Sequence, residues 1–136
     1  MSTLEECGEL KLDFGKLAKA AKACDGLVPV ALQNIDTGEV VLVAYTNELA
    51  FKKAVATRRV VLWSTSRNEL WEKGATSGNT FDLVEVYVNC EQNALLYRIR
   101  PRGQAICHTR NKSGRPRNCF YRRLNLDTRK LENLDP

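Results

Sequence analysis

Hydrophobic and polar positions recur along the chain in patterns that predict regular elements. Over 14–24, apolar residues recur at helical spacing with lysines on the other side, and Asp25-Gly26 follows as a stop signal, so we predict a helix there. Residues 27–35 and 40–45 have strand patterns, and the segment between them, Asp36-Thr37-Gly38-Glu39, is a tight-turn signal. These two strands are therefore predicted to form a β-hairpin.

The middle of the chain continues this alternation of elements. Thr46-Asn47 offers a cap for a helix over 48–57, and Arg58-Arg59 places positive charge at the end of that helix. Further strands are predicted at 60–64, 68–73, 81–88 and 94–100, with loops at 74–79 and 101–118. The charged tail from Leu124 is expected to hold a short helical turn. The pattern predicts one domain over 1–136 with an α+β fold, a mostly antiparallel sheet with two helices.

Composition places the chain among ordinary globular proteins. It has 136 residues, of which 43% are hydrophobic and 27% charged, and it has no apolar run of about 18 residues that would span a membrane. The first residues lack the basic start and apolar stretch of a secretory signal. We therefore expect a cytoplasmic protein without a membrane partner.

The formal net charge of +5 suggests an anionic partner. Lysines and arginines are most concentrated between Arg98 and Arg123, where two cysteines and the only histidine also lie. A nucleic-acid binder is expected to gather basic residues with aromatic ones on one surface. A basic segment around metal-ligating residue types favours a phosphorylated small molecule, so no nucleic-acid partner is expected.

The five cysteines are an odd number, which argues against a disulfide framework. Cys7 and Cys24 are interpreted as buried or incidental thiols. The other three, Cys90, Cys107 and Cys119, lie in predicted loops or at strand ends among polar residues. None belongs to a Cys-x-x-Cys pair, and spacing alone leaves open that they are three unrelated thiols.

If these three cysteines bind one metal ion, their thiolates favour zinc. Three protein ligands leave a fourth position for water, which is the pattern of catalytic rather than structural zinc. Three thiolates also leave negative charge on the centre, which a neighbouring base or cation would offset. His108 and Arg110 are candidates for that role.

Several motifs together resemble one enzyme family over residues 25–123. They are Gly26–Pro29, Asp36–Val40, Val43–Glu48, Leu62–Arg67, Leu70–Asn79, Cys107–Thr109 and Asn118–Arg123. The combination of Trp-x-Lys-Gly-x-Thr-Ser-Gly with Cys-His-Thr and Cys-Phe-Tyr-Arg is specific, and it resembles phosphoribosyl-AMP cyclohydrolases.

The resemblance implies a homodimer with zinc sites across the subunit interface, each taking Cys90 from one chain and Cys107 and Cys119 from the other. It implies hydrolysis of N1-(5-phosphoribosyl)-AMP, a purine nucleotide, between N1 and C6 in histidine biosynthesis. Zinc would activate the attacking water, and His108 matches the residue that moves a proton. Residues that match the nucleotide site are Trp63, Ser64, Ser66, Arg67, Lys73, Gly74, Thr76 and Ser77, and Arg110 is added as a phosphate ligand.

Two segments depart from the family pattern. The family's Asp-Cys-Asp-x-Asp turn, whose aspartates bind magnesium, is here Asn89-Cys90-Glu91-Gln92-Asn93. Because Mg²⁺ prefers carboxylate oxygens, Asn89, Glu91 and Asn93 are expected to form at most a degenerate site. The loop between Cys107 and Cys119 is also longer than usual. Its extra basic residues, Lys112, Arg115 and Arg117, are expected to contact phosphate, and loop drift in a solvated segment is the alternative.

These departures leave three functions open. The first is the cyclohydrolase reaction itself. The second is hydrolysis or deamination of another purine-like nucleotide by a divergent member of the family. The third is a non-catalytic module that binds zinc or a nucleotide, against which the retained cysteines and His108 argue.

Overall fold

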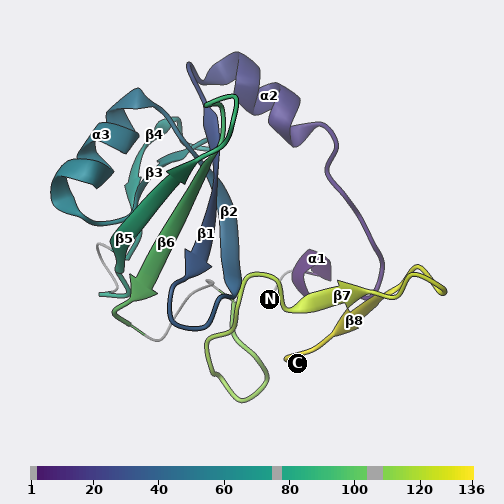
Figure 1. The fold of residues 1–136 in the computed structure, drawn as a ribbon. Helices are drawn as coiled ribbons and strands as arrows, with labels where there is room; N and C mark the ends of the chain where they lie inside the picture. The colour runs from purple at the N-terminus through teal and green to yellow at the C-terminus, as the bar shows by residue number, and fades with distance from the viewer. Residues whose placement is uncertain (1–2, 75–77, 104–108) are drawn as a thin grey trace.

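The computed structural model describes residues 3–74, 78–103 and 109–136, and it has an α+β fold built on a four-stranded sheet (Figure 1). The strand order is β2-β1-β6-β5. The strands are β1 (Val28–Asn34), β2 (Val40–Thr46), β5 (Phe81–Val88) and β6 (Leu95–Pro101). Each outer strand pairs antiparallel with its neighbour, whereas the central strands β1 and β6 run parallel, with Leu32 opposite Tyr97.

One face of the sheet is covered by α3 (Glu48–Thr57) and by the hairpin of β3 (Val61–Ser64) and β4 (Glu69–Glu72). The cap predicted for α3 is confirmed, because Asn47 Oδ1 accepts the Ala50 N–H at 3.0 Å. Ala50 and Ala54 are fully buried, and their small side chains let the helix lie close to the sheet. The largest buried side chains of this core are Tyr97, Phe81, Leu32, Leu62 and Ile99.

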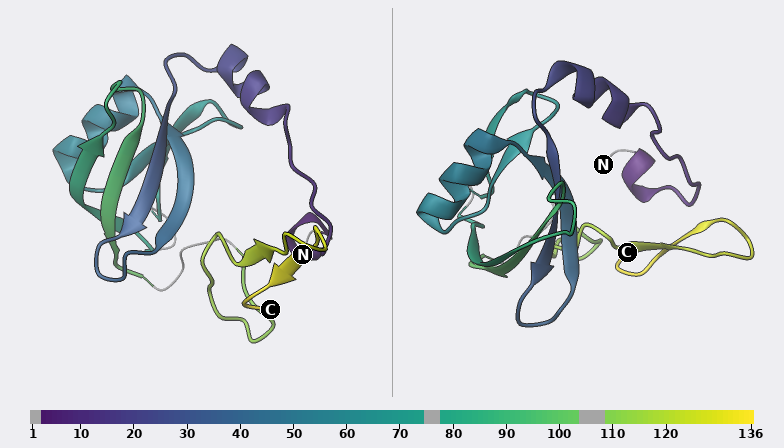
Figure 2. Two further views of the ribbon diagram at one scale, coloured as in Figure 1. Left: turned by 45° about the vertical axis from the view of Figure 1, so that its right-hand side comes forward. Right: turned by 45° about the horizontal axis from the view of Figure 1, so that its top comes forward.

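The opposite face of the sheet carries exposed apolar side chains in the part of the chain that the structure describes. A row of apolar residues crosses all four strands there, because Val43 pairs with Ala31, Ala31 with Leu96, and Leu96 with Tyr87. Val43 and Tyr87 at the two ends of the row are 54% and 49% exposed. We call this row the open face. Helix α2 (Lys16–Ala23) lies at the end of the sheet where β1 begins, and the C-terminal strands extend away from the sheet (Figure 2).

The two ends of the chain form one unit beside the sheet (Figure 1). A short helix that the sequence did not predict, α1 (Thr3–Glu6), lies against a ribbon of β7 (Arg122–Leu124) and β8 (Leu131–Asn133). Leu131 N–H donates to the Gly8 carbonyl at 2.8 Å, and the Tyr121 hydroxyl donates to the Glu5 carbonyl at 2.6 Å.

The helical turn expected in the tail is therefore wrong, because the tail folds back as this ribbon. Asn125 Oδ1 accepts the N–H groups of Asp127 and Thr128, which closes a turn instead of starting a helix. The other predicted elements agree with the observed ones to within two residues at each end. In the three described ranges, no helix is long and apolar enough to cross a membrane.

Candidate active site

The predicted site residues lie at two opposite ends of the sheet. We call the end where β1 begins the first end, and the end where β1 finishes the second end. The β3–β4 turn belongs to the first end, because Cys24, which ends α2 just before β1, donates its Sγ–H to the Thr65 carbonyl at 3.7 Å. The turn that carries Cys90 also belongs to the first end, since Leu95 directly after it pairs with Val30.

A pocket of about 390 Å³ lies at the first end, and three of the predicted nucleotide-site residues line it. These are Trp63, Ser64 and Ser66, and Trp71 from β4 joins them, so both tryptophans of the chain face one cavity. The hydroxyls of Ser64 and Ser66 are 3.4 Å apart. The wall is completed by Thr65, by Val43, Ala44 and Tyr45 of β2, and by Asp13, Lys16, Leu17 and Ala20.

Residues 13–20 are the part of this pocket that sequence reasoning missed. Their pattern predicted a helix correctly, but lysines on one helix face indicate only a solvated surface. A second, larger pocket of about 790 Å³ lies on the α3 side, with Val28, Phe51 and Leu95 among its lining. None of the predicted nucleotide-site residues that the structure describes lines it, so we do not assign it to the reaction.

Arg67 follows the pocket turn, and its guanidinium lies at the surface, 3.4 Å from the Glu69 carboxylate. Both side chains of this pair are more than half exposed, so the attraction between them is weak. Arg67 can therefore exchange this contact for a phosphate group at little cost.

The Cys90 turn is held by its own amide side chains. Asn89 Oδ1 accepts the backbone N–H groups of Asn93 and Ala94, each at 2.9 Å, and Asn93 Oδ1 accepts the Asn89 Nδ2–H at 2.6 Å. Both lone pairs of Asn89 Oδ1 are thus used within the turn. Glu91 is the one carboxylate in this turn, so the residues present do not fit a magnesium ion. Cys90 itself is exposed.

Lys73 and Gly74 lie at the second end. Lys73 Nζ stands 5.3 Å from the centre of the Phe81 ring, a cation–π contact, and Phe81 pairs with Pro101 at the end of β6. A Cβ at Gly103 would lie 1.9 Å from Asn79 Oδ1, so the loop that starts at Gly74 packs directly on the segment that leads from β6 toward Cys107. Thr76, Ser77, Cys107 and His108 lie outside the described residues.

Cys119 also belongs to the second end, because its neighbour Asn118 donates to the carbonyl of Val40, where β2 begins. Cys119 is exposed. Arg110 forms an isolated bridge with Pro116, and its guanidinium donates to the Gly114 carbonyl at 3.2 Å, so this loop folds as a small hairpin.

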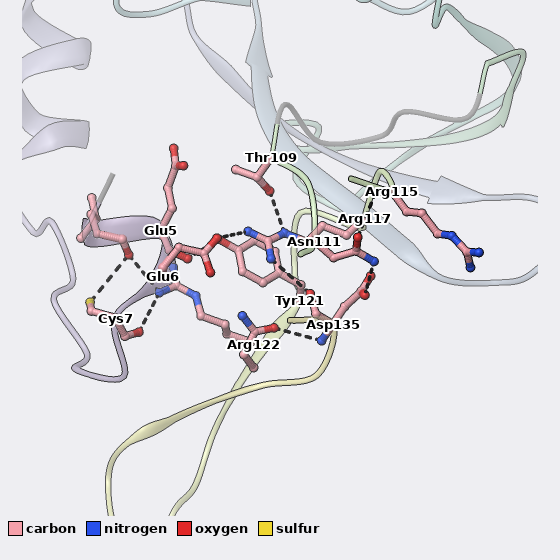
Figure 3. Close-up of polar contacts among 12 residues, drawn as sticks. Glu5, Glu6, Cys7, Thr109, Asn111, Arg115, Arg117, Tyr121, Arg122 and Asp135 are labelled. Atoms are coloured by element: carbon pink, nitrogen blue, oxygen red, sulfur yellow. Dashed lines mark hydrogen bonds and ion pairs between the residues drawn. The ribbon is translucent and has the colours of Figure 1, made fainter. Parts of the chain in front are cut away.

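The expectation that Arg117 contacts phosphate is wrong, because its guanidinium is buried in contacts within the chain. Its side chain is 1% exposed and forms an ion pair with Glu6 at 2.5 Å (Figure 3). The same guanidinium donates to Thr109 Oγ1 and to the Asp135 carbonyl, and it lies 3.6 Å from the centre of the Tyr121 ring. Arg117 therefore holds the loop to the two ends of the chain instead of facing a ligand.

Cys90 and Cys119 are separated by the length of β6. This strand has seven residues, which corresponds to about 20 Å between its ends. Two sulfur ligands of one tetrahedral zinc ion lie about 4 Å apart. Within the described part of one chain, no three His, Cys, Asp or Glu residues gather as a metal group. The three cysteines have the right chemistry for zinc, but Cys90 and Cys119 of one chain lie too far apart to hold the same ion.

The sequence of the chain is similar to those of one protein family. The sequence profile described as phosphoribosyl-AMP cyclohydrolase matches residues 42–121. A phosphoribosyl-AMP cyclohydrolase of Archaeoglobus fulgidus is 47% identical over 102 residues, covering 75% of this chain and 89% of the relative. The one from Halobacterium salinarum is 41% identical over 128 residues, which cover 94% of each chain. A histidine biosynthesis bifunctional protein of Thermus thermophilus is 46% identical over 99 residues, or 73% of this chain and 44% of the relative.

Proposed function

Because the chain belongs to the phosphoribosyl-AMP cyclohydrolase family, we propose that it is the zinc-dependent hydrolase of histidine biosynthesis that opens the adenine ring of N1-(5-phosphoribosyl)-AMP between N1 and C6. The observation that carries this proposal is the pocket at the first end. This pocket is lined by three residues of the family motifs, Trp63, Ser64 and Ser66, which lie far from the cysteines in sequence. Its volume suits part of a nucleotide.

Cys90, Cys107 and Cys119 would hold the zinc ion. Their thiols match the ligand preference of zinc, and Cys90 and Cys119 are both exposed, so a metal ion has access to them. When bound, zinc lowers the pKa of water toward neutrality and so supplies a nucleophile. The magnesium ion that the resemblance implied is not proposed, since the Asn89–Asn93 turn uses its amide oxygens internally.

The separation of Cys90 from Cys119 supports a homodimer with a site shared between chains. Each site would combine Cys90 and the tryptophan pocket of one chain with Cys107, His108 and Cys119 of the other. The open face supports the same assembly, because an apolar row across a whole sheet is a surface that a second copy can bury.

The chain's own residues have distinct roles in this proposal. The indoles of Trp63 and Trp71 offer flat apolar surfaces for the purine, and the Ser64 and Ser66 hydroxyls offer hydrogen bonds to it. Arg67, Lys73 and Arg110 would bind phosphate oxygens through charge-assisted hydrogen bonds. Gly74, Thr76 and Ser77 would bring backbone and hydroxyl groups to the substrate. His108 would carry the proton between water and the departing ring nitrogen.

The decisive experiment mixes two inactive variants. Cys90→Ser and Cys119→Ser homodimers should each lack zinc at the shared site and turn over no substrate. Unfolding and refolding them together should restore about a quarter of wild-type activity, because half of randomly paired dimers have one intact site of two. Wild-type protein treated in the same way is the control and should recover activity. If it does and the mixture stays as inactive as each variant alone, the shared site is wrong.

A divergent activity is the second candidate, and the altered turn at Asn89–Asn93 is the observation that favours it. In that case a folded, zinc-replete dimer would leave phosphoribosyl-AMP unchanged but hydrolyse or deaminate another purine-like nucleotide. Assaying the wild type with phosphoribosyl-AMP, by the absorbance of the ring-opened product, distinguishes the two candidates.

A further inference from the structure

We propose that Lys16 is a substrate-binding residue, and that α2 forms the phosphate-binding wall of the tryptophan pocket. The inference deepens the proposed function and rests on it. The ligand class is a purine nucleoside phosphate whose base lies against the indoles of Trp63 and Trp71, with a phosphate group at Lys16 Nζ.

The first support is the position of α2 in the cavity wall. Lys16, Leu17 and Ala20 lie on one side of this helix, and all three line the pocket together with β2 and the β3–β4 hairpin. Ala20 is 7% exposed, so the helix packs against its neighbours at this point. Leu17 is 54% exposed, so α2 borders the pocket along one side and faces solvent on the rest of its surface.

The second support is that the end of α2 is tied to the pocket turn. At the start of the helix, Asp13 Oδ1 accepts the backbone N–H groups of Gly15 at 3.1 Å and Lys16 at 3.0 Å, which forms a local turn before the first helical residues. After the helix, the buried Cys24 donates to the carbonyl of Thr65, a residue of the pocket. The Cys24 contact joins the helix that carries Lys16 to the serine turn and so helps to preorganise the site.

The third support is the distribution of charge. Among the described residues that line this pocket, Lys16 is the only cation and Asp13 the only anion. The Asp13 carboxylate already accepts two backbone N–H groups. The remaining polar side chains of the lining, those of Tyr45, Ser64, Thr65 and Ser66, are neutral hydroxyls. A phosphate entering the pocket therefore meets one positive group, and that group is Lys16.

Both tryptophans of the chain line this pocket, so their fluorescence reports directly on its occupancy. The test is a fluorescence titration of the zinc-loaded dimer with AMP and, separately, with adenosine. The variants are Lys16→Met, its charge-retaining counterpart Lys16→Arg, and Lys19→Met. Lys19 is on the same helix but does not line the pocket, which makes it the matched control.

We expect Lys16→Met to weaken AMP binding about tenfold, as loss of one charge-assisted hydrogen bond predicts, and to leave adenosine binding unchanged. Lys19→Met should bind AMP like the wild type, and Lys16→Arg should retain most of the affinity. Equal AMP affinities in the wild type and Lys16→Met would overturn the inference. So would equal losses for AMP and adenosine, or a wild-type fluorescence that millimolar AMP does not change.

Turnover of phosphoribosyl-AMP provides the second measurement. Lys16→Met should raise KM about tenfold with kcat within about twofold, because a ground-state phosphate contact binds substrate and transition state alike. Zinc content should stay at the wild-type value. If the wild type does not turn over this substrate, the proposed function fails, whereas the comparison of AMP with adenosine still decides the role of Lys16.

Discussion

The guanidinium of Arg117 lies buried against the carboxylate of Glu6, 111 positions earlier in the chain. This ion pair fastens the first helix to the loop that leads to Cys119, and the Asp135 carbonyl adds the last residues of the chain to the same guanidinium (Figure 3). The loop of the proposed metal ligands is therefore held by both ends of the chain.

Replacing Glu6 tests this arrangement. Glu6→Gln should lower the free energy of unfolding by about 2 kcal/mol. This is less than the cost of removing one partner of a fully buried ion pair, because the Glu6 side chain is 32% exposed. Glu9→Gln is the control, since the Glu9 carboxylate pairs with Lys11 at 3.8 Å and both side chains of that pair are more than half exposed. Urea unfolding of both variants is the measurement, and equal midpoints for Glu6→Gln and Glu9→Gln would refute the role of the pair.

Variants of the Cys107-His108 pair should separate metal binding from proton transfer. Cys107→Ser should lose zinc and activity together. His108→Ala should keep zinc and lose about 100-fold or more in kcat, the range expected for removal of a general acid–base group. Zinc is measured by a chelator assay and activity by product absorbance. A His108→Ala variant with full turnover would remove His108 from the mechanism.

Magnesium should change the rate of the wild type little, because the turn around Cys90 uses its amide oxygens in its own hydrogen bonds. The variant with both Asn89→Asp and Asn93→Asp places two carboxylates together, so it should be less stable without magnesium and regain stability with it. Thermal unfolding with and without millimolar Mg²⁺ measures this. A wild-type rate that depends strongly on magnesium would show that a second metal site exists.

Gly103 is expected to tolerate no side chain. A Cβ there would lie 1.9 Å from Asn79 Oδ1 and 2.8 Å from Asn79 Cα, so Gly103→Ala must displace the Gly74–Asn79 loop. We expect a loss of about 2 kcal/mol in stability and a matching fall in activity. Gly8→Ala is the control, because its nearest contact would be an ordinary 3.7 Å. Equal melting temperatures for the two variants would contradict this packing.

Tyr97 should make the free energy of unfolding fall as the pH rises into the alkaline range. Its hydroxyl is buried and has no hydrogen bond of good geometry to a described residue. Burial raises the pKa of Tyr97 from 10.0 to about 12, and the nearby Thr46 hydroxyl opposes this only in part. The unfolded chain therefore loses its proton first, so the stabilising contribution is complete below pH 10 and is lost between pH 10 and about 12.

Tyr97→Phe removes both the unpaired hydroxyl and this titration. At pH 7 the variant should be as stable as the wild type or about 1 kcal/mol more stable. Above pH 10 it should lose less stability than the wild type, measured by urea unfolding at a series of pH values. A variant that is clearly less stable at pH 7 would show that the hydroxyl is hydrogen-bonded.

The order of secondary elements could be predicted because their causes are local. Asn47 caps α3 through a contact three residues away, and the turn after β1 closes through Asn34, whose carbonyl accepts the Gly38 N–H. The helical turn predicted for the tail was wrong, because Asn125 closes a local turn that joins β7 to β8. The contact of this ribbon with Gly8, far earlier in the chain, has no local signal in the sequence.

Motif spacing and hydrophobic periodicity are properties of neighbouring positions, so the family, the secondary elements and the residue types of the site could be read from the sequence. Where these residues stand relative to one another came only from the folded structure. It paired β1 with β6 in parallel, placed Cys90 and Cys119 at opposite ends of that pair, and buried Arg117 against Glu6. It also brought Lys16 to the tryptophans. These relations arise from packing between distant segments, and no local stretch of sequence contains the geometry of that packing.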